Sequence, residues 1–133
     1  MLSKGSERVT ITSKAPGKLF IAGEYAVVEP GHSAIVASVS RFLTVTIDKA
    51  TSVGTLTSTQ NPDIVVEWSR KGELLQAKGD HPYKLVEEAI LASEQYVRES
   101  GKATDALYSL SITSELDDAK RGIKYGLGSS GAV

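Results

Sequence analysis

Alternation of apolar and polar residues with a period of two dominates the first half of the chain, and it constrains the fold most. Runs of this kind cover residues 9–12, 43–47 and 64–69. Because successive side chains of a strand point to opposite faces, each run predicts a strand with one buried face. The continuous apolar run at residues 19–22 predicts a short strand that is buried on both faces.

One amphipathic helix is predicted from Pro82 to Ser100. Asp80 or His81 can cap it, Pro82 suits the first helical position, and Gly101 can end it. Six apolar residues recur at helical spacing, with four charged residues outside the stripe: Leu85, Val86, Ala89, Ile90, Tyr96 and Val97, against Glu87, Glu88, Glu94 and Arg98.

The order of elements predicts an α+β fold. A further strand is expected around residues 108–112, after the helix, while residues 51–60 are expected to form a loop or an exposed edge strand. Strands followed by one helix and another strand do not make a regular βαβ series.

Length and composition exclude several classes of protein. A chain of 133 residues is one domain or part of a larger one, and the absence of cysteine excludes disulfides and thiolate sites. A net charge of -1 gives no field that favours nucleic acid or an anionic membrane. Residues 1–6 are polar, and no apolar run approaches the roughly 20 residues that span a bilayer. We therefore expect a soluble cytoplasmic protein without nucleic-acid or membrane partners.

The segment from Lys124 to Val133 is rich in glycine and serine and suits a polyphosphate. Small residues let the backbone approach a ligand, and N–H groups at a turn into a helix attract anions. The hydroxyls of Ser129 and Ser130 can bond phosphate oxygens or a magnesium ion, and Lys124 supplies a cation. The alternative is a flexible linker. Leu127 and the apolar pair Ala132–Val133 argue against it, because flexible linkers seldom contain such residues.

Two other motifs match the same residues by pattern alone. Gly126, Gly128 and Gly131 fit the dinucleotide fingerprint and, with Val133, the protein-kinase glycine loop. The first needs a preceding strand and an acidic residue about 20 positions later, and the second needs a lysine on the next strand. The chain supplies neither.

A second unusual segment runs from Lys14 to Gly31. Lys18, Glu24 and Tyr25 flank the apolar run at residues 19–22, and Pro16–Gly17 predicts a turn before it. Polar residues at the ends of a buried strand can face a cleft, or they can lie on the surface.

Together the two segments resemble the GHMP small-molecule kinases. Lys14–Tyr25 matches the pattern K-x-P-G-K-x-x-x-x-G-E-[H/Y], and Gly126–Ser130 matches G-L-G-S-S, in the family's order and at a plausible separation. Tyr25 in place of histidine and Gly131 in place of alanine favour the branch that phosphorylates phosphomevalonate.

The resemblance implies a fold and a reaction. Residues 1–133 would be the N-terminal part of such a kinase, a ribosomal-protein-like two-layer α/β sandwich truncated at the start of the phosphate-loop helix. The partners would be ATP, Mg²⁺ and phosphomevalonate, and a homodimer is compatible with the resemblance. The catalytic aspartate and the acidic magnesium ligand of the family lie beyond residue 133, so we expect this chain to be inactive alone.

The resemblance also implies roles for individual residues. The ATP phosphates would be held by the glycine-rich segment, through Lys124, Gly126, Leu127, Gly128, Ser129 and Ser130. Ser130 would contact Mg²⁺, and Lys18 would neutralise charge at the transferring phosphoryl group as the catalytic residue. Lys18, Glu24 and Tyr25 would contact the acceptor.

Several alternatives stay open at this point. His81 could touch the substrate, although a histidine before a helix proline is more often a capping feature. Asp117 and Asp118 could form a metal or base pair, but a solvated charged loop is the simpler interpretation. Other members of the family, mevalonate kinase or diphosphomevalonate decarboxylase, and a non-catalytic anion- or RNA-binding α+β domain remain rival functions.

Overall fold

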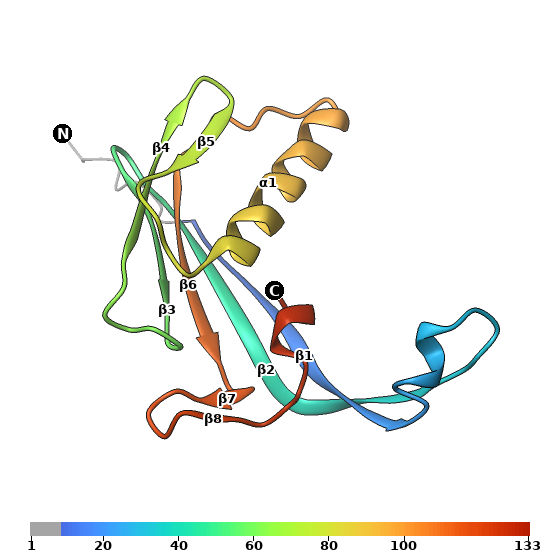
Figure 1. Cartoon of the computed structure of the whole chain (residues 1–133). Coiled ribbons are helices and arrows are strands. Elements are labelled where there is room, and N and C mark those ends of the chain that lie inside the picture. Colours follow the sequence, from blue (N-terminus) through green and yellow to red (C-terminus); the bar gives the residue numbers. More distant parts are fainter. Residues whose placement is uncertain (1–8) are drawn as a thin grey trace.

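A six-stranded mixed sheet carries one long helix on one face (Figure 1). The computed structural model describes residues 9–133, and Figure 1 shows α1 packed across the sheet. The strands and helices are β1 (Thr10–Ala22), the 3-10 turn η1 (Ala26–Val28), β2 (Ile35–Lys49), β3 (Gly54–Ser58), β4 (Val66–Lys71), β5 (Leu74–Ala77), α1 (Lys84–Glu99), β6 (Tyr108–Ser114), β7 (Asp117–Asp118), β8 (Ile123–Lys124) and the 3-10 turn η2 (Ser129–Gly131).

The strand order β1-β2-β6-β3-β4-β5 confirms the predicted α+β class. Neighbours in the sheet are antiparallel except β3 and β6, which run parallel with Leu56 opposite Leu110. The chain between these two strands forms β4, β5 and α1, so the helix belongs to the crossover that a parallel pair requires. A separate two-stranded ribbon, β7-β8, leads into the glycine-rich end.

The core lies between α1 and the sheet. It is built from apolar side chains of both layers: Leu43, Leu56, Val66, Trp68, Leu75, Tyr83, Val86, Ile90, Leu110, Ile112 and Leu116. Trp68, in the alternating run at residues 64–69, is buried, and its indole N–H donates to the Tyr108 carbonyl at 2.7 Å. Gly54 makes room for this ring, because a Cβ there would overlap the indole.

A buried ion pair joins the helix to the sheet, where the sequence predicts an exposed glutamate. The Arg70 guanidinium contacts the Glu94 carboxylate at 2.5 Å, and each side chain is only 8% exposed. The Tyr108 hydroxyl donates to the same carboxylate at 2.8 Å. Placing Glu94 on the outer face was therefore wrong: Leu85 and Tyr96, expected in the apolar stripe, are exposed instead.

The helix begins two residues later than predicted. Tyr83 is its N-cap without a side-chain cap of its own, so Pro82 lies before the first turn rather than in it. At the other end the prediction is confirmed, because Gly101 follows the helix with a left-handed φ of 75°.

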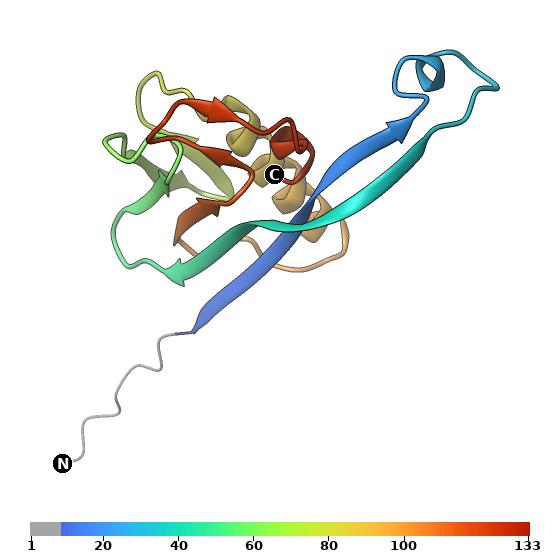
Figure 2. The same ribbon diagram turned by 90° about the horizontal axis from the view of Figure 1, so that it is seen from below.

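Residues 19–22 are not buried on both faces, so that prediction was wrong. Leu19, Phe20 and Ile21 are exposed, Ile21 to 62%. They belong to the distal half of a long β1–β2 hairpin, which extends away from the rest of the chain with η1 near its tip (Figure 2). Only β2 pairs with β1, since β1 is the edge strand.

Pro16 and Gly17 do not form the predicted turn. They lie within β1, where the register with β2 shifts between Pro16 and Lys18. An edge strand tolerates proline, because one row of its N–H groups has no ladder partner. Between these paired positions β1 has one residue, Gly17, whereas β2 has three, so the register changes across Gly17.

The stretch at residues 51–60 forms an inner strand rather than a loop or exposed edge. β3 pairs with β4 on one side and β6 on the other, and Leu56 and Ser58 are buried. The sequence does not predict this buried strand, because Leu56 is an isolated apolar residue among threonine and serine and shows no alternating pattern.

Candidate functional site

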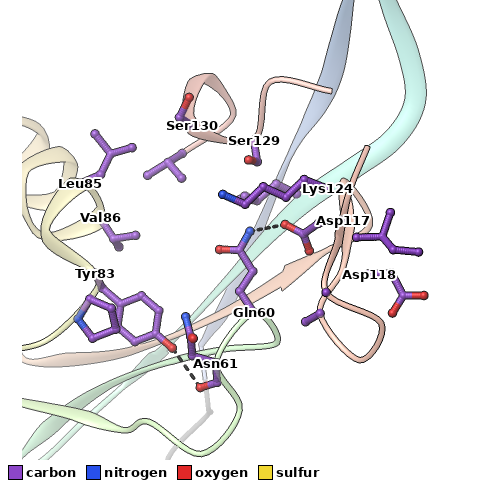
Figure 3. Close-up of a pocket in the computed structure, with 16 residues that line it drawn as sticks. Gln60, Asn61, Tyr83, Leu85, Val86, Asp117, Asp118, Lys124, Ser129 and Ser130 are labelled. Carbon is purple, nitrogen blue, oxygen red and sulfur yellow. Dashed lines mark hydrogen bonds between the residues drawn. The ribbon is translucent and has the colours of Figure 1, made fainter. Parts of the chain in front are cut away.

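A pocket of about 460 Å³ opens between the start of α1, the end of β3 and the glycine-rich segment. Figure 3 shows its labelled residues facing a common space. Five parts of the chain line it: Leu43 of β2; Gln60 and Asn61 after β3; Pro82, Tyr83, Leu85 and Val86 at the helix start; Asp117, Asp118, Ala119, Gly122, Ile123 and Lys124 of the β7-β8 ribbon; and Ser129, Ser130 and Val133 at the glycine-rich end.

The glycine-rich segment forms a tight turn against this pocket. Gly126 and Gly128 have φ angles of 70° and 71°, which L side chains adopt only with strain. η2 follows, and its hydrogen bonds are donated by Gly131 and Ala132. The preceding N–H groups, on Ser129 and Ser130, therefore have no acceptor within the turn. Donors and hydroxyls of this kind suit an anion.

Lys18 lies directly against the same turn. A Cβ atom built on Gly131 would stand 2.5 Å from the Lys18 Nζ, and one built on Gly128 would stand 2.9 Å from its Cγ and Cε. The backbone is joined as well, because the Lys18 N–H donates to the Leu127 carbonyl at 2.8 Å. Two segments more than 100 residues apart thus meet, with the ammonium beside the turn.

Gly17 is what allows this approach. It is buried, and a Cβ there would stand 2.7 Å from Leu116 Cδ2 and 3.0 Å from the Leu127 carbonyl oxygen. Any larger residue would push that carbonyl away from the Lys18 N–H. The register shift across Gly17 and the absence of a side chain there together let β1 lie against the turn.

Opposite the glycine turn, the pocket wall is uncharged. The Tyr83 hydroxyl donates to the Asn61 carbonyl at 3.1 Å (Figure 3). Burial raises the pKa of the Tyr83 phenol, although the bond to Asn61 opposes this, so the group stays a neutral donor. Leu85 and Val86 add apolar surface beside it.

Charged groups of both signs line the ribbon side. Lys124 extends across the pocket in Figure 3, while Asp117 accepts a hydrogen bond from the Gln60 amide. Asp118 accepts from the Arg121 N–H at 3.2 Å. Both aspartates are half-buried in β7, so the expected solvated loop was the wrong description.

Glu24 and Tyr25 lie apart from this pocket. Both are exposed near the tip of the β1–β2 hairpin, Tyr25 to 85%, and neither lines the pocket. Lys124, Ser129 and Ser130 thus line the pocket and Lys18 contacts the turn beside it, whereas Glu24 and Tyr25 directly precede η1, which lies near the far end of the hairpin (Figure 2).

His81 is buried beneath the helix start rather than in the pocket. Its Nδ1 accepts the Tyr83 N–H at 3.2 Å, and the His81 N–H donates to the Asp80 carboxylate at 3.1 Å. Asp80 and His81 thus order the approach to the helix, but neither caps it in the predicted way.

Sequence reasoning missed the wall formed by Gln60, Asn61 and Tyr83. The only local signal is Asn61-Pro62-Asp63, which is typical of a turn and does not indicate a pocket. Nothing local to Tyr83 distinguishes it from an ordinary core aromatic.

Two further findings concern metal binding and membrane crossing. Among residues 9–133, no cluster of three or more histidine or acidic side chains could hold a metal ion. Over the same residues, no helix has the length and apolarity needed to cross a bilayer.

Comparison with known proteins places the chain beside one kind of enzyme. No protein-family model matches it. It is 38% identical over 135 residues to the phosphomevalonate kinase of Streptomyces sp. (strain CL190), covering 93% of this chain and 35% of that protein. This agrees with the resemblance that the two motifs predicted.

Solved structures point the same way. A Streptococcus pneumoniae phosphomevalonate kinase in complex with phosphomevalonate and AMPPNP matches with a TM-score of 0.70 and 27% identity, covering 92% of this chain and 33% of that one. A Listeria innocua protein matches with a TM-score of 0.75 and 37% identity, covering 93% and 33%. The chain spans about a third of the length of the relatives it matches.

Proposed function

We propose that this chain supplies the N-terminal part of a GHMP-type phosphomevalonate kinase, the part that grips the phosphates. The enzyme would transfer the terminal phosphoryl group of ATP to the phosphate of 5-phosphomevalonate, releasing ADP and 5-diphosphomevalonate. The observation that carries the proposal is the contact between Lys18 and the turn at Gly128–Gly131. The similarity to phosphomevalonate kinases supports it independently.

The glycine turn suits the phosphates of ATP. The free N–H groups of Ser129 and Ser130 donate without rearrangement, and Lys124 adds a positive charge on the pocket side. Gly126, Leu127 and Gly128 shape the turn; Leu127 uses its carbonyl to hold Lys18. The charged end of a nucleotide would lie here, and its uncharged part along Tyr83 and Leu85.

Lys18 would act as the catalytic cation. Phosphoryl transfer spreads negative charge over the phosphoryl oxygens, so positioned positive charge lowers the barrier. The bond from the Lys18 N–H to Leu127 holds the main chain of this residue beside the turn. Among the residues that the structure describes, no carboxylate forms an ion pair with the Lys18 ammonium. Its charge is therefore available to the phosphate.

Mg²⁺ fits this site in part. Ser130 offers a hydroxyl at the pocket, which is a hard oxygen ligand of the kind that Mg²⁺ accepts beside phosphates. When bound, the ion would neutralise phosphate charge. Asp117 and Asp118 are already engaged with Gln60 and Arg121, so we assign no acidic ligand to this chain.

Glu24 and Tyr25 would contact the acceptor where other polypeptide of the enzyme brings it to the hairpin. His81 is buried and does not line the pocket, so it would not touch the acceptor. The enzyme would act in the cytoplasm on small-molecule substrates, as a monomer or a homodimer.

The test is an ADP-release assay on the complete product of the gene. Mevalonate, phosphomevalonate and diphosphomevalonate are supplied in turn with ATP and Mg²⁺. Turnover with phosphomevalonate alone supports the proposal. Turnover with either of the others instead, or ATP-independent binding of RNA without any turnover, contradicts it.

A further inference from the structure

A buried histidine lies behind the pocket wall and is not used by the phosphate chemistry. The His81 side chain is 3% exposed and lies beneath the start of α1, in a small space that it shares with Trp68 and Leu75. Burying a polar ring costs free energy unless its nitrogens are satisfied. The contacts of the two nitrogens therefore indicate why it is there.

The two nitrogens face different groups of the helix start. Nδ1 accepts the backbone N–H of Tyr83 at 3.2 Å. Nε2 lies 3.4 Å from Glu87 Oε2, close enough for attraction but not aligned as a hydrogen bond. Because Nδ1 is an acceptor, the proton of the neutral ring must be on Nε2, facing that carboxylate.

Tyr83 is fixed at three points, of which His81 supplies one. Its carbonyl accepts the Glu87 N–H at 3.0 Å, and its hydroxyl donates to Asn61 at 3.1 Å. Its φ and ψ of -95° and 36° are not helical, and the helix has no side-chain cap at this residue. The bond from Tyr83 N–H to His81 thus holds the residue where the backbone enters the helix.

We propose that His81 is a positioning residue for nucleotide binding, which acts by holding Tyr83 in the pocket wall. His81 itself does not line the pocket, whereas Tyr83 does. The inference rests on the proposed function in one respect: the ligand whose uncharged part lies along Tyr83 is ATP. The acceptor nitrogen of His81, rather than the bulk of its ring, sets the affinity for that ligand.

Amide substitutions separate the acceptor from the bulk. In His81→Asn the side-chain oxygen takes about the place of Nδ1, whereas in His81→Gln it lies about where Nε2 was. His81→Leu keeps apolar volume and has no acceptor. His32→Asn, at an exposed histidine, is the matched control.

The first measurement needs no enzyme activity. Hydrogen exchange of the Tyr83 amide is followed by NMR in the complete gene product. We expect exchange about five- to tenfold faster in His81→Leu and His81→Gln, and near the wild-type rate in His81→Asn and His32→Asn. Equal exchange in the Asn and Gln variants would overturn the inference.

The second measurement connects the bond to the ligand. In the complete gene product, His81→Gln should raise the KM for ATP about three- to tenfold with kcat within about twofold, while His81→Asn restores the KM. A merely structural role would lower the unfolding temperature of both variants without separating their KM values, and that result overturns the inference. Absence of turnover in the wild type instead counts against the proposed function, while the exchange result still decides the role of the His81 acceptor.

Discussion

The Nζ atom of Lys18 lies directly against Gly131. A Cβ atom added to this glycine would be only 2.5 Å from the ammonium, so there is room for the lysine only because Gly131 has no side chain. The first belongs to the edge strand β1 and the second to the last turn of the chain. This contact brings the two motifs together, and most of the predictions below depend on it.

Replacing Lys18 should impair turnover far more than folding. Lys18 is exposed and makes its hydrogen bond through the backbone, so Lys18→Met removes charge but little packing. We expect kcat of the complete gene product to fall about a hundredfold or more, with the unfolding temperature nearly unchanged. Lys14→Met, at an exposed lysine on the same strand, is the control and should keep full turnover. Wild-type turnover in Lys18→Met would remove this residue from the mechanism.

Two glycines with the same backbone conformation should respond differently to alanine. Gly128 and Gly101 have φ of 71° and 75°, so alanine strains either by about 1 kcal/mol. Only at Gly128 does the new Cβ also meet Lys18, at 2.9 Å, whereas Gly101, at the end of α1, faces open space. Urea unfolding should show similar losses of stability. The KM for ATP should rise at least about tenfold in Gly128→Ala and little in Gly101→Ala; equal KM values would show that the contact does not matter.

The buried ion pair should dominate the stability of the helix–sheet interface. Glu94→Gln leaves the Arg70 charge buried without a partner, which costs about 3 kcal/mol of the free energy of unfolding. Urea unfolding followed by the fluorescence of Trp68 measures this. Glu88→Gln, at an exposed glutamate of the same helix, should change the free energy by less than about 0.5 kcal/mol. If the two variants lose equally little, the pair is not structurally important.

The same carboxylate gives stability a defined pH dependence. Burial opposes ionisation of Glu94, but hydrogen bonds from Arg70 and Tyr108 outweigh it and lower its pKa below the ordinary 4.5. A lowered pKa in the folded state stabilises the fold above pH 4.5, and this contribution disappears as the pH falls through the folded pKa. Unfolding free energies measured between pH 3 and 7 should therefore fall more steeply at the acid end for the wild type than for Glu94→Gln. Parallel curves would contradict this assignment.

Local patterns in the sequence predicted most strands and the helix, but not which of their faces other parts of the chain cover. The alternation at residues 43–47 and 108–112 is correctly assigned to β2 and β6, because both lie over the core. The apolar run at residues 19–22 was misassigned, since hydrophobicity alone does not say whether a covering layer exists in the same chain. Glu94 was misplaced for the related reason that its partner, Arg70, comes from a strand 24 residues earlier.

For the site, paired motifs carried information that single residues did not. The contact between Lys18 and the glycine turn follows from two segments that fold together, and the resemblance to a kinase family linked them in advance. The wall at Asn61 and Tyr83 could not be predicted, because it forms where the β3 exit meets the helix start. Gly17 gave only a turn signal, although its lack of a Cβ permits the approach of Leu127.

Binding of AMPPNP with Mg²⁺ to the complete gene product, followed by amide NMR signals, tests the central claim most directly. If one triphosphate is held by both segments, the signals of Lys18 and of Gly128, Ser129 and Ser130 should shift along a single binding curve. The signal of Tyr25, at the hairpin tip, should stay unmoved. Shifts in the glycine turn with Lys18 unaffected, or with a different dissociation constant, would show that the two segments do not form one site.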